Sequence, residues 1–130
     1  MNFRNRNHQA IFLAATTKFD RRDKVKMSVL YLLTADSRLW KASKPHIVRG
    51  QIHLERIRMG NGSERTYALL CCAKDLTYGT NHLTVADLAD IELVSPKLYV
   101  LIMTAIGIYR YGLEHKKFGN RGNECVQTNT

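Results

Sequence analysis

Apolar residues follow helical spacing along most of this chain and are densest near its C-terminal end. The segment 98–109 contains no charged residue. Ser95 before it suits an N-cap, and Pro96 suits the first helical position. Gly112 suits a helix end, so the pattern predicts a helix over about 96–111. Because a membrane span needs about 18–20 apolar residues, the segment is too short to cross a bilayer. We therefore expect this helix to be the central one of a protein core.

The other amphipathic segments predict shorter helices, and all but the first have a candidate residue whose side-chain oxygen can cap free backbone N–H groups. Their expected ranges are 6–19, 23–34, 36–44, 64–77 and 85–92. The candidate caps are Asp20 or Asp23, Asp36 or Ser37, Ser63, and Thr84 in a capping box with Asp87. The face that the first helix buries is expected to consist of Ile11, Ala14, Ala15 and Phe19. Gly107 lies within the last helix, where glycine costs about 1 kcal/mol relative to alanine, and this indicates a close helix crossing.

These elements predict an all-α protein, a compact bundle of about five or six helices around the central helix 96–111. Irregular structure, a short helix and a two-stranded hairpin all stay open for the segment near 50–60, which ends in a turn signal, Gly-Asn-Gly. Trp40, the only tryptophan, is expected at the edge of the core. One domain over 1–117 and a polar tail over 118–130 complete the expected organisation.

Positive charge is concentrated in the first half of the chain. The whole chain carries 20 Lys and Arg against 11 Asp and Glu, a formal net charge of +9. Residues 1–26 hold seven basic against two acidic residues, whereas residues 61–95 hold two against five. Such asymmetry fits either a solvated basic face or contact with an acidic partner, protein or nucleic acid. The candidate phosphate-binding residues are Arg4, Arg6, Lys18, Arg21, Arg22, Lys24, Lys26, Lys41, Lys44 and Arg49.

Residue patterns that carry catalysis or cofactor binding are missing from the sequence. It has no HExxH, GxxxxGK[ST], GxGxxG or GxSxG motif. Cys71, Cys72 and Cys125 lack metal-ligand spacing and are expected to be reduced thiols. The stretch DLADIELVSPKLYVLI resembles a helix-turn-helix, but Lys97 is the only basic residue near the start of its second helix. We therefore expect no enzyme, no cofactor and no metal site.

Three stretches carry a resemblance to a known family: YLLTADSRLW, CCAKDLTYGTNHLTVADLAD and LVSPKLYVLIMTAIGIYRYG. They resemble small uncharacterised proteins encoded on conjugative transposons and related mobile elements of gut anaerobic bacteria. The similarity covers about residues 2–115. That family has no assigned activity, so the resemblance implies a mobile-element setting and a cytoplasmic location, and it carries over no functional residue.

Three functions remain open from the sequence. The first is a non-enzymatic accessory protein of a mobile element that acts through protein–protein contacts, including self-association. The second is a sequence-independent nucleic-acid-binding module that uses the basic N-terminal half. The third is an inhibitor of a host defence nuclease. No membrane partner is expected for any of them.

Overall fold

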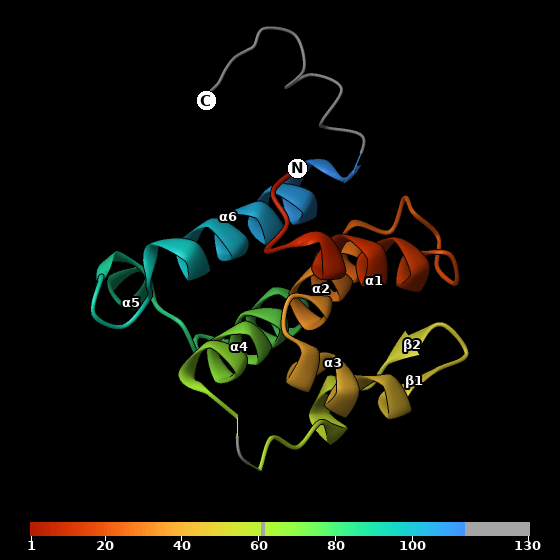
Figure 1. The fold of residues 1–130 in the computed structure, drawn as a ribbon, viewed down its shortest axis with the longest axis horizontal. Helices are drawn as coiled ribbons and strands as arrows, with labels where there is room; N and C mark the ends of the chain where they lie inside the picture. Colours follow the sequence, from red (N-terminus) through yellow and green to blue (C-terminus); the bar gives the residue numbers. More distant parts are fainter. Residues whose placement is uncertain (61, 114–130) are drawn as a thin grey trace, which may run out of the picture.

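Six α-helices and a short hairpin form the described part of the computed structural model, residues 1–60 and 62–113 (Figure 1). In chain order they are α1 (Arg6–Thr16), α2 (Lys24–Thr34), α3 (Ser37–Ser43), the 3-10 turn η1 (Lys44–His46), β1 (Ile47–Val48), β2 (Gln51–Ile52), the 3-10 turn η2 (Leu54–Arg56), α4 (Glu64–Tyr78), α5 (Val85–Ala89) and α6 (Pro96–Tyr111). The predicted all-α class is confirmed. The predicted tail, 118–130, lies outside the described residues.

Helix starts agree closely with the predicted caps. Asp23, Asp36, Ser63, Thr84 and Ser95 each accept a backbone N–H bond from the first turn of the helix that follows. The capping box at the start of α5 is present in both directions, since Thr84 and Asp87 each bond the other's backbone N–H.

Two helices end earlier than predicted, each for a local reason. At the end of α1, the backbone N–H groups of Thr17 and Lys18 bond carbonyls three residues back, which tightens the turn and stops the helix at Thr16. At the end of α5, the Asp90 carboxylate accepts the backbone N–H of Glu92, a local bond that competes with helix propagation.

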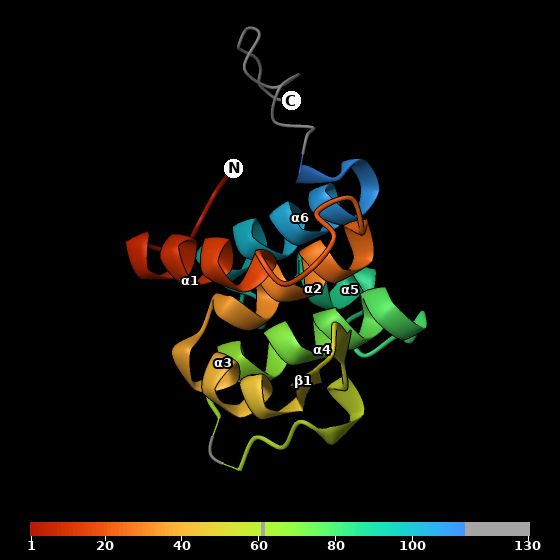
Figure 2. The same cartoon turned by 90° about the vertical axis from the view of Figure 1, so that its right-hand side faces the viewer.

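The centre of the core is α2, and this corrects the prediction that the helix 96–111 is the central one. Figures 1 and 2 show α2 enclosed by α1, α4 and α6, and every residue of Met27–Thr34 is buried. By contrast, α6 exposes one side, which carries Tyr99, Val100, Tyr109 and Tyr111. The hydroxyls of Ser28 and Thr34 bond carbonyls of their own helix, so these polar residues are buried without loss of hydrogen bonds.

Two further predictions about packing were wrong. A Cβ added at Gly107 would meet no atom within 4 Å, so no close helix crossing occurs there. In α1 the buried residues are His8, Phe12 and Thr16, whereas Ala14 is exposed. Apolar periodicity selects a face by counting apolar residues, and it counts His8 and Thr16 as polar. It therefore pointed to the neighbouring face instead of the one that α1 buries.

A two-stranded hairpin occupies part of the segment that the sequence left open. β1 and β2 pair antiparallel, with Ile47 opposite Ile52. The connecting Arg49 and Gly50 both have positive φ, 52° and 76°, as two-residue hairpin turns require. Trp40 is half-buried and packs against the core edge, which confirms its predicted place.

Candidate binding surfaces

The N-terminal segment is fixed to the core by an aromatic cluster of Phe3, His8, Phe12 and Tyr31. The ring centroids of His8 and Tyr31 lie 4.7 Å apart, and those of Phe3 and Phe12 lie 5.7 Å apart. His8 Nδ1 accepts the backbone N–H of Arg4 at 2.9 Å, so its Nε2–H donates to the Tyr31 carbonyl, also at 2.9 Å. The Tyr31 hydroxyl donates to the Asn2 carbonyl. These bonds hold Arg4 in a defined place on the surface.

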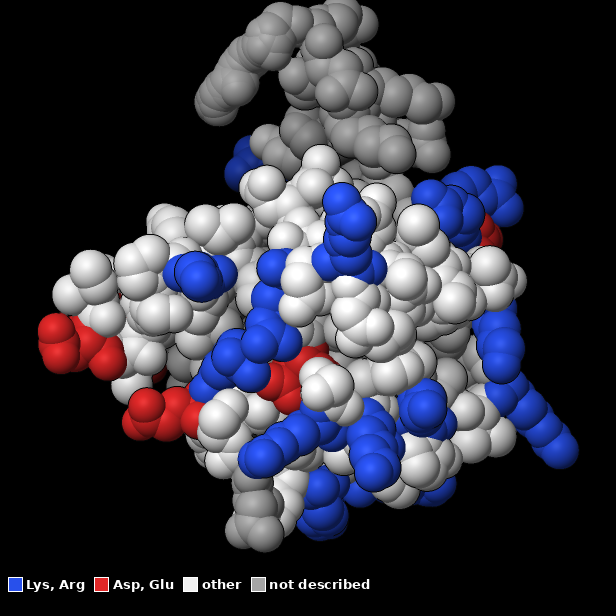
Figure 3. All heavy atoms as spheres, in the orientation of Figure 1, with Lys and Arg blue, Asp and Glu red and all other residues white. Residues whose placement is uncertain are grey.

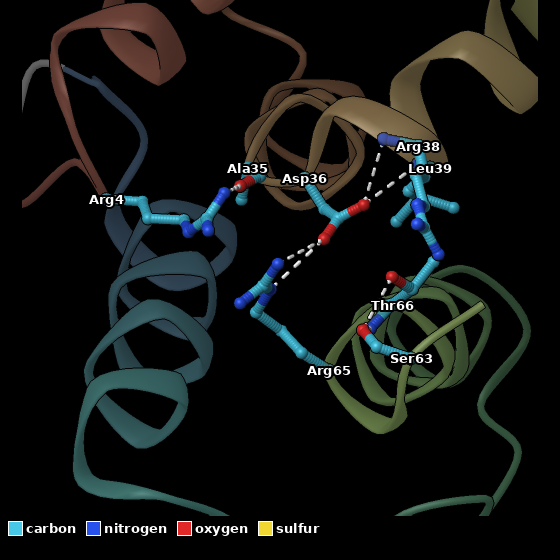
Figure 4. A network of polar contacts seen from close by, with 8 residues as sticks. All are labelled: Arg4, Ala35, Asp36, Arg38, Leu39, Ser63, Arg65 and Thr66. Atoms are coloured by element: carbon cyan, nitrogen blue, oxygen red, sulfur yellow. Dashed lines mark hydrogen bonds and ion pairs between the residues drawn. The ribbon is translucent and has the colours of Figure 1, made fainter.

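A buried carboxylate, Asp36, connects α3 and α4 next to Arg4 (Figure 4). One of its oxygens caps α3, accepting the backbone N–H groups of Arg38 at 3.0 Å and Leu39 at 3.1 Å. The other accepts Nε and Nη2 of Arg65 from α4, at 3.0 and 2.9 Å. Burial raises the pKa of Asp36, but the Leu39 N–H group and Arg65 outweigh it, so the net shift is downward. Asp36 is therefore a carboxylate at neutral pH.

Arg4 and Arg65 extend into the same groove, which we call the cationic groove (Figure 4). Its volume is about 600 Å³. Its lining residues are Phe3, Arg4, Asn5, Arg65, Ser95, Lys97, Leu98, Val100 and Leu101. Among these described lining residues there are three cations and no Asp or Glu. The groove thus combines positive charge with apolar walls from α6.

A second groove, the tryptophan groove, runs between α1 and α3. It has a volume of about 440 Å³. Its lining residues are Ile11, Ala14, Ala15, Lys18, Phe19, Trp40, Lys44 and Ile47. All of them are apolar except Lys18 and Lys44, which are exposed. An apolar surface flanked by exposed lysines suits an apolar ligand face bordered by acidic groups.

The ten predicted phosphate-binding residues do not line one common groove. Arg4 lines the cationic groove, Lys18 and Lys44 line the tryptophan groove, and Arg22 and Lys24 line a shallow surface beside Arg110 of α6.

Members of the predicted set differ in whether an acidic side chain or another polar atom lies close enough to pair with them. Arg22 pairs with Asp20 and Lys26 with Asp23. Lys26 also donates to the Gly50 carbonyl, and Arg21 donates to the Thr16 hydroxyl. Within the described chain, the exposed Arg6, Lys41 and Arg49 have no acidic partner.

Sequence analysis missed two cations of the cationic groove, Arg65 and Lys97. Arg65 lies in the acidic middle of the chain, and Lys97 begins an apolar helix, so neither belongs to a local basic cluster. Only the packing of α4 and α6 against the N-terminal segment brings them to Arg4. Figure 3 shows Lys and Arg spread across this face, with Asp and Glu at the left, on the side of α5, and in a smaller group near the centre.

His82, which follows α4, forms a close pair with Asp75 in the last turn of that helix, with Nδ1 2.9 Å from the carboxylate. The same carboxylate accepts the Thr80 hydroxyl and the backbone N–H groups of His82 and Leu83. Thr80 also lies 3.0 Å from His82 Nδ1, the nitrogen that faces Asp75. Because hydroxyl and carboxylate share one nitrogen, the histidine cannot relay a proton between them. This arrangement closes the loop that follows α4.

The described residues were also compared with the requirements of a metal site and of a membrane-spanning helix. Across 1–60 and 62–113, no three His, Cys, Asp or Glu side chains gather as a set able to hold a metal ion. Within the same ranges, no helix combines the length and apolarity needed to cross a bilayer. Comparison of the chain with protein-family models, curated proteins and solved structures gave no significant match.

Proposed function

We propose that this chain is a non-enzymatic accessory protein that binds an acidic protein partner through the tryptophan groove, in a bacterial mobile-element setting. The observation that carries the proposal is the groove itself, which the half-buried Trp40 lines together with Lys18 and Lys44. Tryptophan is enriched among residues that dominate binding energy, and apolar grooves between helices accept amphipathic helices. The occupant that fits this surface is an amphipathic helix with acidic residues beside its apolar face.

Charge supports an acidic partner. Formal net charge on the chain is +9, which favours association with acidic molecules at low ionic strength. Lys18 follows α1 and Lys44 begins η1, and both line the same apolar surface. Carboxylates of a bound helix can therefore pair with lysines at the groove, which favours an acidic partner over a neutral one.

Affinity capture from a bacterial lysate, followed by titration of the purified partner, tests this proposal. Trp40 is the only tryptophan, so its fluorescence reports directly on occupancy of the groove when the partner contains none. Lys44→Glu is expected to weaken binding about tenfold or more, since it places a like charge against an acidic ligand. Lys41→Glu is the matched control, because Lys41 is an exposed residue that does not line the groove. Equal binding by both variants would contradict the proposal, as would capture of no acidic protein.

A nucleic-acid-binding function is the second candidate, favoured by the exposed and unpaired Arg6, Lys41 and Arg49 of the described chain. These side chains lie on different elements and could reach separate phosphates without reading bases. Fluorescence anisotropy with duplex and single-stranded oligonucleotides tests it. Binding of this kind is expected to fall steeply as salt rises. Absence of binding at low salt would remove this candidate.

A further inference from the structure

We propose that the cationic groove binds an organic phosphate monoester that carries an apolar group. Three cations from three separate elements converge there: Arg4 from the N-terminal segment, Arg65 from α4 and Lys97 from α6. This site is distinct from the tryptophan groove and shares no lining residue with it. The inference therefore stands independently of the proposed protein partner.

Local charge favours a doubly charged anion. Arg4, Arg65 and Lys97 contribute three positive charges, and Asp36, which is buried behind Arg65, contributes one negative charge. The formal balance at the groove is +2. A phosphate monoester carries about −1.5 to −2 at neutral pH, whereas a carboxylate carries only −1. A phosphate therefore neutralises the site more completely.

The two guanidinium groups are held in place before a ligand arrives. Arg65 uses Nε and Nη2 on Asp36, and Arg4 uses Nη1 on the Ala35 carbonyl at 3.3 Å. Neither side chain is saturated by these bonds, because a guanidinium has five N–H donors. The Arg65 side chain is 42% exposed, so its remaining donors reach the solvent of the groove. Such pre-positioned donors lose less conformational entropy on binding an oxyanion than mobile lysines do.

Apolar walls indicate what the phosphate is attached to. Phe3 and Val100 line the groove beside the cations and are partly open to solvent, whereas the lining residues Leu98 and Leu101 are buried beneath it. The volume of about 600 Å³ falls within the range of small-molecule sites, about 300–1,000 Å³, and exceeds what one phosphate group requires. An aryl or short alkyl group attached to the phosphate would cover Phe3 and Val100 and remove their exposed surface from water.

Titration with phenyl phosphate, followed by two-dimensional NMR and calorimetry, tests the inference. We expect saturable binding with shifts in the backbone signals of Arg4, Arg65 and Lys97. Lys97→Met is expected to weaken binding about tenfold or more, the loss of one charge-assisted hydrogen bond. Lys41→Met removes the same charge from α3 outside the groove and is expected to bind like the unmodified chain. Since Lys97 is exposed, its substitution leaves the core intact, and Arg4→Met provides a second variant at an exposed position.

Two related ligands separate the contributions of charge and apolar contact. Benzoate has the ring with one negative charge, and inorganic phosphate has the charge without the ring. Both are expected to bind more weakly than phenyl phosphate. Equal affinity for phenyl phosphate and inorganic phosphate would overturn the organic part of the inference. Lack of saturable binding by phenyl phosphate, or equal losses in Lys97→Met and Lys41→Met, would overturn the site itself, and neither result would affect the tryptophan groove.

Discussion

Arg65 donates two hydrogen bonds to a single oxygen of Asp36, from Nε at 3.0 Å and from Nη2 at 2.9 Å. The same carboxylate caps α3 with its other oxygen. The pair thus joins the start of α3 to the first turn of α4, across 29 residues of sequence. It also sets the direction of the Arg65 guanidinium beside the cationic groove. One buried carboxylate therefore links the stability of the fold to the geometry of its surface charge.

Substituting Asp36 is expected to destabilise the protein strongly. Asp36→Ala removes the cap of α3 and leaves Arg65 without its partner, and the side chain of Asp36 is only 3% exposed. Losing the helix cap together with the charge-assisted hydrogen bonds from Arg65 to a buried carboxylate should lower the free energy of unfolding by about 3 kcal/mol. Urea denaturation followed by circular dichroism measures this loss.

The matched control for that substitution is Asp87→Ala. Asp87 serves the exposed capping box of the five-residue α5, where the expected loss is below about 1 kcal/mol. Losses of similar size in both variants would show that Asp36 contributes no more than an ordinary cap.

The stability of the protein should fall as pH drops because of His8. Burial is the main cause that lowers the pKa of His8; its bond to Tyr31 opposes this shift, and the charge of Arg4 adds to it. The unfolded chain has the ordinary pKa of about 6.5 and therefore takes up a proton before the folded chain does. The contribution of neutral His8 is complete above about pH 6.5 and is lost as pH falls towards the lowered pKa.

Comparison with His8→Gln isolates this dependence. The glutamine amide nitrogen can replace Nε2 as donor to the Tyr31 carbonyl, but it does not titrate. The free energy of unfolding of the unmodified protein is expected to decrease relative to that of the variant between about pH 7.5 and 5. Parallel pH profiles of the two proteins would contradict the role given to His8.

Local signals in the sequence were sufficient to predict the helices. Caps such as Asp36 and Ser63 act within a few residues, so their effect on the backbone is visible in a short window. The central position of α2 was not visible in this way. It depends on how α1, α4 and α6 pack around α2, which no short window of the sequence shows.

The cationic groove could not be predicted from short stretches of sequence either. Arg4, Arg65 and Lys97 are separated by dozens of residues, and only tertiary packing brings them to one groove. The predicted basic set included Arg4 because it lies in a run of positive charge. Charge counted along the sequence therefore identified basic segments without identifying which cations meet in space.

Gly107 should be replaceable with a gain in stability. It lies inside α6, and a Cβ there meets nothing within 4 Å. Gly107→Ala is expected to raise the free energy of unfolding by about 0.5–1 kcal/mol, since alanine loses less backbone entropy in a helix.

Gly79→Ala is the opposite case. Gly79 ends α4 with φ of +72°, a conformation that costs alanine about 1 kcal/mol. Thermal unfolding of both variants measures the two changes, and destabilisation by Gly107→Ala would show that the site lacks the space found here.

The two thiols of α4 should react only when the protein opens. Burial raises the pKa of Cys72 to about 12, and it also raises that of Cys71, against the effect of the Tyr67 hydroxyl. At about pH 8 the thiolate fraction of Cys72 is then on the order of one in ten thousand, and both residues are 5% exposed.

In a Cys125→Ser background, which removes the thiol outside the described residues, labelling by a thiol reagent is expected to be slow under native conditions. It should reach two equivalents in denaturing guanidinium. Because reaction then requires opening of the helix bundle, the labelling rate should rise with Asp36→Ala and fall with Gly107→Ala. Rapid labelling of both thiols in the native protein would contradict the burial of this face of α4.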